Sequence, residues 1–428
     1  MTESRTITAE PPAVDAAGAV DARETFRRVK RHFSPALAVA GRFSGQGAVE
    51  VSAEGCRVAL SDGRDVLDFG SYGVALLGHR NPEIVRAVRA QLDIMPASTR
   101  SLQSAVAPLA AERLAAYVGG GLNRVYFGSG GADAVEAALK LARMASGRNT
   151  VVAVEGAFHG KTVGALSLTD NPRFKSGLDP AFQEGVLRVS PDDPEAVAKA
   201  VRAHDVAAVF FEPVQAENGV RVLDEAVLAR WCRDAHEHGA FVVADEIQVG
   251  LRRCGARSLA LAAGLGVDAV LLGKQLGGGV LPLSAAVGND RLFAPLLADP
   301  MLHTATFSGH PLSTSVIPYA LDVIERHAEN GGRIAAAMEQ GLATVRELFP
   351  DAVAEIRGRG LLWGVDLASP AMAGEVLTGL ARRSLVVSPC LSRPTTIRLL
   401  PPIVATEDDV KEAMTLLSDA IAEAVAAP

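Results

Sequence analysis

Short apolar runs alternate with helical patterns from about residue 124 to residue 324, and this alternation constrains the possible folds more than any other feature of the sequence. Stretches with helical spacing, such as 132–145 and 225–238, separate the runs. Strands that alternate with helices form βαβ units, so we predict an α/β fold with a mainly parallel sheet. The predicted strands of this sheet are residues 125–127, 150–154, 207–211, 241–244 and 269–272.

The segments on either side of this region predict a second, smaller unit. Before it, residues 49–51, 57–60 and 66–69 form short alternating segments separated by turn residues, which indicates an antiparallel layer. Helical spacing follows from Asn81 and again over residues 106–117.

The tail of the chain returns to a mixed pattern. An amphipathic stretch over residues 313–327 leads into it, and strand patterns at 361–367 and 396–399 alternate with helices. The predicted division of the chain is a disordered segment at 1–23, a small α+β domain from 24–75 and 330–428, and a large α/β domain from 76–329.

Composition excludes several classes of protein. The net charge is −7 over 428 residues, so nothing indicates a nucleic-acid-binding surface. No apolar run reaches the ~18 residues of a membrane span, and the start of the chain lacks the order of a signal peptide. The four cysteines show no metal-ligand spacing, which fits a reduced cytoplasm. We therefore expect a cytoplasmic protein without a metal, nucleic-acid or membrane partner.

A lysine after the last buried run is the first candidate catalytic residue. Lys274 follows residues 269–272 and so lies at the carboxyl edge of the predicted sheet, where open α/β sheets bind their ligands. Glycines on both sides let a ligand approach the backbone. A buried lysine can form a Schiff base with a carbonyl group, because desolvation lowers its pKa. The alternative is a surface lysine in a glycine-rich turn.

A second strand end places polar side chains at the same edge. Asp245 follows the run 241–244, and a carboxylate there can hold a protonated ring nitrogen as an ion pair. Its neighbour Glu246 diverges from it and is expected to make structural hydrogen bonds. Ile247 could cover a face of such a ring, and Gln248 could donate to one of its oxygens.

Two turns offer contacts for a phosphorylated aromatic ligand. The glycine-rich turn at Gly130 and Gly131 joins a strand to a helix, whose N–H groups and dipole can bind phosphate. The segment GAFHGKT (156–162) lacks the glycine spacing of a nucleotide-binding P-loop. Its Phe158 could stack on an aromatic ring, with core packing as the alternative. His159 could equally be a satisfied loop histidine.

An arginine inside an apolar strand of the tail needs a counter-charge. Arg398 lies within residues 396–399, and a buried guanidinium requires a carboxylate from the protein or from a substrate. Glu217 follows the buried run 207–211 and therefore reaches the same edge of the sheet as Lys274. A plain structural salt bridge is the alternative for Arg398.

Together these segments resemble the class III aminotransferases, which are fold-type-I enzymes that use pyridoxal 5′-phosphate. The resemblance covers nearly the whole chain after about residue 30 and implies a large domain with a mainly parallel sheet flanked by helices, plus a smaller α+β domain. It rests on motifs in family order, namely GHRNP (78–82), VEAALKLAR (135–143), FHGKT, EPVQ, DEIQVG, the lysine stretch, HTATFSGHPL (303–312) and IRLLPP.

The resemblance implies a role for each candidate residue around the cofactor. Lys274 would carry the cofactor as a Schiff base and then act as the base in proton transfer, while Asp245 would hold the pyridinium nitrogen. Phe158 and Ile247 would enclose the ring, with Gln248 near its phenolic oxygen. The remaining contacts would come from Gly130, Gly131, Ala132, His159 and, from a neighbouring subunit, Thr306. At least a homodimer with shared active sites is therefore expected, and a tetramer is possible.

Family features also bear on the substrate. Arg398 would bind the α-carboxylate of glutamate, and Glu217 would neutralise Arg398 when the bound amine lacks that carboxylate. Lys161 stands where ornithine-specific members carry an arginine, and it lacks the bidentate fork. Tyr72 is a further candidate for substrate contact. The usual Ser-Gly-Thr of the phosphate turn is Gly130-Gly131-Ala132 here, which removes two hydroxyl donors.

The expected activity is that of a ping-pong ω-aminotransferase. The resemblance is to putrescine aminotransferases in particular, so one substrate would be a diamine or a biosynthetic aliphatic aldehyde. The other would be an amino acid and 2-oxo acid pair, either glutamate and 2-oxoglutarate or alanine and pyruvate. The alternatives are an acetylornithine, ornithine or 4-aminobutyrate aminotransferase, and an aminomutase, which would not need the pairing of Glu217 with Arg398.

Overall fold

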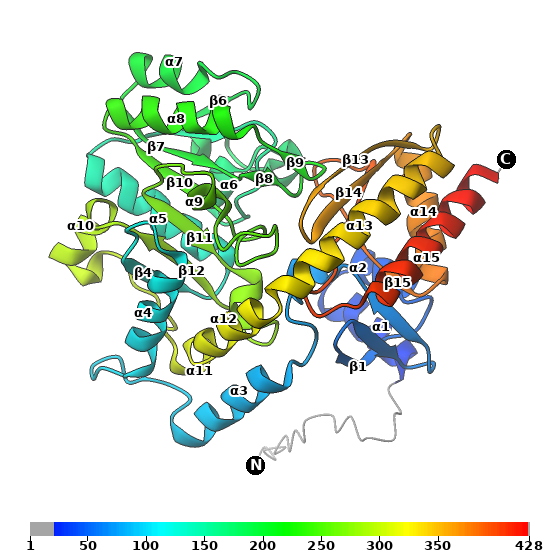
Figure 1. Cartoon of the computed structure of the whole chain (residues 1–428). Helices are drawn as coiled ribbons and strands as arrows, with labels where there is room; N and C mark the ends of the chain where they lie inside the picture. Colours follow the sequence, from blue (N-terminus) through cyan, green and yellow to red (C-terminus); the bar gives the residue numbers. More distant parts are fainter. Residues whose placement is uncertain (1–20, 427–428) are drawn as a thin grey trace, which may run out of the picture.

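A seven-stranded sheet forms the centre of the computed structural model, which describes residues 21–426 (Figure 1). The strand order is β4-β12-β11-β10-β7-β5-β6, and every pairing is parallel except those of β12 with β11 and β4. The prediction of a mainly parallel sheet is therefore confirmed. The strands are β4 (Arg124–Gly128), β5 (Thr150–Val154), β6 (Val186–Val189), β7 (Val206–Phe211), β10 (Phe241–Asp245), β11 (Ala269–Leu272) and β12 (Ser284–Gly288).

Alternation along each strand divides the core between the two faces of this sheet. In β5, Val151 and Ala153 belong to the apolar cluster beneath helix α5, whereas Val152 and Val154 belong to the cluster on the other face. The central strands β7, β10 and β11 are buried along their whole length because helices cover both faces. The helices of the central part of the chain are α3 (Pro82–Ile94), α4 (Val106–Val118), α5 (Gly131–Ser146), α6 (Val163–Leu168), α7 (Ala196–Ala203), α8 (Glu225–Glu237), α9 (Leu259–Ala262), α10 (Asp290–Ala298), α11 (Pro311–Thr314) and α12 (Ile317–Arg326).

The two ends of the chain meet beside this unit (Figure 1). Strand β15 (Leu385–Val386) pairs in parallel with β3, and β1 to β3 form the predicted antiparallel layer. A separate sheet has the order β13-β14-β17-β16. The other elements are β1 (Glu50–Glu54), β2 (Arg57–Leu60), β3 (Asp65–Asp68), β8 (Val214–Gln215), β9 (Arg221–Val222), β13 (Val353–Arg359), β14 (Leu362–Leu367), β16 (Ser388–Pro389), β17 (Thr396–Leu399), α13 (Ala328–Leu348), α14 (Pro370–Arg382) and α15 (Glu407–Ala426).

Two N-terminal helices were not predicted, α1 (Ala22–His32) and α2 (Pro35–Ser44). Both carry ordinary start signals: the Asp21 carboxylate accepts the N–H groups of Arg23 and Glu24, and Ser34 caps α2 ahead of a proline. The predicted disordered segment 1–23 therefore ends too late, and its residues 1–20 lie outside the described part. The proposed domain boundaries remain a prediction. Between residues 21 and 426, no helix is long and apolar enough to cross a membrane.

Candidate active site

Neighbouring strands deliver the predicted site residues to one edge of the sheet. Strands β7, β10 and β11 run in parallel, with Asp245 beside Leu271 in the register. Glu212 directly follows β7, Asp245 is the last residue of β10, and Lys274 lies two residues after the end of β11. The carboxyl ends of parallel strands lie at the same edge, so the predicted convergence is present.

Asp245 is buried and held from two sides. Its Oδ2 lies 2.8 Å from Nδ1 of His159, and its Oδ1 accepts the N–H of Ile247 at 3.1 Å. His159 is buried as well, and its own N–H donates to Thr169 Oγ1 at 2.9 Å. His159 is therefore a partner of Asp245 and not an isolated loop residue. These contacts fix the direction in which the carboxylate points.

Lys274 opens the short 3-10 turn Lys274–Gly277 in a strained conformation. Its φ of 43° lies in the left-handed region, which non-glycine residues rarely adopt outside functional sites. Burial lowers the pKa of Lys274, the Glu217 carboxylate raises it and Arg398 lowers it, and the net direction is downward. A larger fraction of neutral amine is thus available to act as nucleophile or base.

The Ile247 side chain packs between the glycine-rich turn at Gly131 and Gly273, the residue before Lys274. A Cβ added at Gly131 or at Gly273 would lie 3.1 Å from the Ile247 side chain, so glycine allows both segments to close on it. Helix α5 begins at Gly131, where the carboxylate of Asp133 already accepts the N–H groups of Ser129 and Gly130 at 2.8 and 2.9 Å. The N–H groups of Gly131 and of Ala132, the next residue, are then the candidate phosphate donors.

A buried glutamate that was not among the predicted site residues positions Phe158. Glu212 follows β7, and its Oε1 accepts the N–H of Phe158 at 2.8 Å. Burial raises the pKa of Glu212 well above its usual range, and the charge of Asp245 adds to the rise. The sequence signal was available, because a carboxylate directly after a wholly apolar strand needs a partner. Phe158 itself is half-buried.

The buried arginine of the tail takes its counter-charge from the protein. Nη1 of Arg398 lies 2.7 Å from Oε1 of Glu217, and the two residues are 1% and 7% exposed. The same Nη1 donates to the Ala216 carbonyl at 3.2 Å, and the Leu391 N–H donates to Oε2 of Glu217 at 3.1 Å. The prediction that Arg398 requires a carboxylate is confirmed. The Glu217 charge raises the pKa of Lys274 and the Arg398 charge lowers it, so both members of the pair bear on this lysine.

Two predicted substrate contacts flank this site. Lys161 is exposed, and its ammonium lies 4.3 Å from the ring centre of Phe174 and 5.9 Å from that of Phe158. Tyr72 is 69% exposed and lies in the 3-10 turn Ser71–Gly73 with a φ of 51°. A Cβ at Gly73, the next residue, would lie 2.9 Å from Nε2 of Gln248, so the backbone of this turn packs closely against the Gln248 side chain.

Thr306 lies apart from the residues at the sheet edge. It is exposed and lines a hollow with Arg100, Phe127 and His310. Its predicted contact comes from a neighbouring subunit and therefore stays a prediction.

The edge also carries buried polar atoms that have no hydrogen-bond partner among the described residues. Within the described residues, Gln248 Nε2 and His159 Nε2 are buried and have no hydrogen-bond partner. A buried donor left without a partner costs free energy, so such atoms point to a ligand with polar groups. Glu246, by contrast, accepts from Ser258 Oγ and from the N–H groups of Leu259 and Ala260, which confirms its structural role.

The arrangement is suited to a flat, phosphorylated carbonyl compound. It offers an amine of lowered pKa at Lys274, a carboxylate at Asp245, apolar side chains at Phe158 and Ile247, and a helix N-terminus at Gly131. Among residues 21–426, no group of three or more His, Cys, Asp or Glu side chains is placed to hold a metal ion.

Known proteins share this organisation. The family model for aminotransferase class-III matches residues 44–421. A putrescine aminotransferase of Pectobacterium atrosepticum is 34% identical over 387 residues, which cover 87% of this chain and 82% of the relative. Among solved structures, the ornithine aminotransferase of Toxoplasma gondii ME49 has a TM-score of 0.86 at 28% identity, covering 94% of this chain and 96% of the other. A PLP-bound amine transaminase of an uncultivated Pseudomonas species has a TM-score of 0.79 at 27% identity, with coverages of 88% and 95%.

Proposed function

Because this chain belongs to the class III aminotransferases, which are PLP-dependent transaminases of fold type I, we propose that it transfers an amino group between a terminal amine and a 2-oxo acid. The amine would be a diamine such as putrescine, or the product of an aliphatic aldehyde. Glutamate with 2-oxoglutarate, or alanine with pyruvate, would be the other pair. The observation that carries the proposal is the buried contact between Glu217 and Arg398.

The residues at the sheet edge fit pyridoxal 5′-phosphate. The unpartnered Nε2 of Gln248 would donate to the phenolic oxygen, and Asp245 would hold the ring nitrogen. Phe158 and Ile247 would cover the ring. Further contacts would come from His159 and, at the phosphate, from Gly130, Gly131, Ala132 and Thr306 of a neighbouring subunit. When bound, the cofactor supplies an electron sink for negative charge at the carbon next to the transferred nitrogen.

The chain's own groups supply binding, orientation and proton movement. Lys274 would hold the cofactor through Nζ and carry a proton at the same atom, for which its lowered pKa suits it. His159 and the Ile247 N–H keep Asp245 in one orientation, and Glu212 keeps the backbone of Phe158 in place. These contacts would prepare the site before any substrate enters.

The pairing of Glu217 with Arg398 supports two unlike substrates in one pocket. A bound amine without a carboxylate leaves Arg398 dependent on Glu217, because breaking a buried pair costs on the order of 3–5 kcal/mol. The α-carboxylate of glutamate can take the place of Glu217 and so offset this cost. An aminomutase handles a single molecule and would not need such an exchange.

Lys161 supports a second candidate, an ω-amino acid such as acetylornithine, ornithine or 4-aminobutyrate. Such a substrate brings a carboxylate of its own, and Lys161 is an exposed cation next to Phe158. The ammonium already contacts the ring of Phe174 and offers only a point charge. The terminal amine therefore remains the favoured substrate, and the identity to a putrescine aminotransferase supports it.

We also propose a homodimer, or a tetramer built from it, in the cytoplasm. Apolar side chains at the start of the chain are exposed in the single chain, among them Phe33, Leu37 and Val39, and a second copy could bury them. All four cysteines are free and buried, which fits a reducing compartment.

Removing each charge of the pair in turn tests the proposed function. Glu217→Ala should slow the half-reaction with the terminal amine about tenfold or more, because Arg398 is left buried and unpaired, and should spare or accelerate the half-reaction with glutamate. Arg398→Ala should do the reverse. Each half-reaction can be followed separately by stopped-flow absorbance of the cofactor.

Glu329→Ala is a suitable control, because this carboxylate is exposed and, among residues 21–426, pairs only with Arg333 of its own helix. If Glu217→Ala and Arg398→Ala slowed both half-reactions to the same extent, the pair would be structural only and the dual-substrate assignment would be lost.

A further inference from the structure

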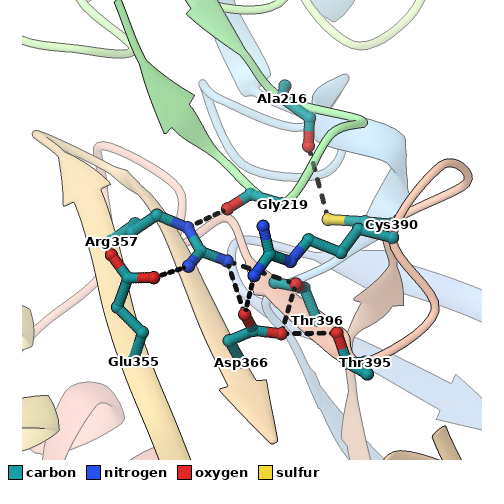
Figure 2. Close-up of polar contacts among 9 residues, drawn as sticks. Ala216, Gly219, Glu355, Arg357, Asp366, Cys390, Thr395 and Thr396 are labelled. Atoms are coloured by element: carbon teal, nitrogen blue, oxygen red, sulfur yellow. Dashed lines mark hydrogen bonds and ion pairs between the residues drawn. The ribbon is translucent and has the colours of Figure 1, made fainter. Parts of the chain in front are cut away.

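The turn that carries Glu217 is fixed by groups from the C-terminal part of the chain. It joins β8 to β9, and its carbonyl oxygens point toward the sheet β13-β14-β17-β16 (Figure 2). The Ala216 carbonyl accepts from Arg398 Nη1 at 3.2 Å and from Cys390 Sγ at 3.4 Å. The Glu217 carbonyl accepts the Ser392 N–H at 3.0 Å. The Gly219 carbonyl accepts from Nε of Arg357 at 2.7 Å.

Arg357 is in turn held by a buried carboxylate, Asp366 on β14. Nη2 of Arg357 lies 3.2 Å from Oδ2 of Asp366, and Arg393 reaches the same oxygen at 2.5 Å. The hydroxyl groups of Thr395 and Thr396 donate to Oδ1 at 2.5 and 3.0 Å. Figure 2 shows how these groups converge on Asp366 beneath the turn. The Asp366 carboxylate therefore contacts both arginines that lie against the turn, and Glu355 pairs with Nη1 of Arg357 in addition.

The turn has a conformation that its own residues would not favour. Gly219 has a φ of 78° and Val220 a φ of 57°, and a positive φ is unusual for a β-branched residue. A Cβ at Gly219 would lie 2.5 Å from Cδ of Arg393 and 2.9 Å from Nη2 of Arg357. Strained backbone persists only where the surroundings hold it in place. Here the surroundings are the two arginines and, through them, Asp366.

We propose that Asp366 is a positioning residue for the pair of Glu217 and Arg398, and that it fixes the backbone of residues 216–220 so that only the Glu217 side chain moves between the two substrates. The inference rests on the proposed function. Three backbone carbonyls are anchored, whereas the Glu217 carboxylate is held by Arg398 and one N–H. A fixed backbone returns the carboxylate to Arg398 each time a carboxylate substrate leaves.

Asp366→Asn keeps the shape of the side chain and removes the charge that Arg357 and Arg393 share, while Glu355 still pairs with Arg357. The turn should then relax, and Glu217 should compete less well for Arg398. We expect the half-reaction with the terminal amine to slow about tenfold and the half-reaction with glutamate to change by less than about twofold. Glutarate, a dicarboxylate without an amino group, should bind the holoenzyme more tightly by calorimetry, as it should in Glu217→Ala.

Asp268→Asn is the matched control. Asp268 is also buried and also meets an arginine, Arg291, but it precedes β11 at the opposite edge of the sheet. Its replacement should lower stability without separating the two half-reactions. If Asp366→Asn does not fold, Arg357→Lys carries the same test, because it keeps the positive charge and removes the second branch of the guanidinium.

The outcomes separate the inference from the proposed function. The positioning role is supported if Glu217→Ala and Asp366→Asn both slow the half-reaction with the terminal amine much more than the half-reaction with glutamate. Separation by Glu217→Ala alone, with Asp366→Asn and Arg357→Lys behaving like Asp268→Asn, overturns the positioning role and leaves the proposed function intact. Equal slowing by Glu217→Ala overturns the proposed function and this inference with it.

Discussion

Lys274→Ala is expected to abolish turnover, with a loss of at least about 10⁴-fold, because the variant loses both the amine that binds the cofactor and the group that moves the proton. The expectation follows from the position of Lys274 after β11, its left-handed φ and its lowered pKa. The absorbance band of the lysine-bound cofactor should disappear at the same time. Lys411→Ala is the control, since this lysine is exposed and pairs with Asp408 within helix α15.

Mapping the attachment site gives an independent check. Borohydride reduction of the wild-type holoenzyme followed by peptide mass spectrometry should place the pyridoxyl group on Lys274. Labelling of any other lysine would overturn the assignment of the whole site.

Asp245→Asn should retain the cofactor but slow turnover by about 10²- to 10³-fold. An amide cannot balance the charge on a protonated ring nitrogen, so the electron sink weakens. In the variant the amide oxygen would still accept the Ile247 N–H and the amide nitrogen would face Nδ1 of His159, which is why binding should survive. Turnover and cofactor content can be measured on the same preparation.

Glu246→Gln is the matched control for Asp245→Asn. This neighbour is fully buried, but its carboxylate serves only Ser258, Leu259 and Ala260 in the described structure, so its loss should affect stability more than chemistry. Near-normal turnover of a folded Asp245→Asn variant would rule out the proposed role of Asp245.

The strands that the sequence predicted well are those buried on both faces. Thr150–Val154 and Ala269–Leu272 have the predicted bounds because each is an unbroken apolar run. Strand β12 was missed because Ser284–Gly288 consists largely of small residues and follows a glycine-rich segment. Strand β6 was missed because Arg188 interrupts its pattern, and Arg188 instead donates to backbone carbonyls at 167–169.

Site residues were predictable from the sequence where the burial of one charged residue requires a partner of opposite charge. A buried arginine in an apolar strand requires a carboxylate, and the contact of Arg398 with Glu217 meets that requirement. The link from Arg357 to Gly219 spans 138 residues of sequence, and nothing local to either residue indicates it. The contact between His159 and Asp245 was likewise beyond sequence reasoning, because it depends on the path of the segment between β5 and His159.

The central claim is that the preferred amino substrate is a terminal amine without its own carboxylate. Single-turnover kinetics with putrescine and 4-aminobutyrate test it most directly, because the two carry the same reacting amine on chains of equal length and differ in the charge of the far end. Stopped-flow absorbance of the cofactor would give the rate constant and apparent affinity for each, and 2-oxoglutarate or pyruvate would then return the enzyme to its starting form. We expect the ratio of rate constant to apparent dissociation constant to be at least about tenfold higher for putrescine, a difference of about 1.4 kcal/mol. A higher value for 4-aminobutyrate would contradict the claim and identify an ω-amino acid as the substrate.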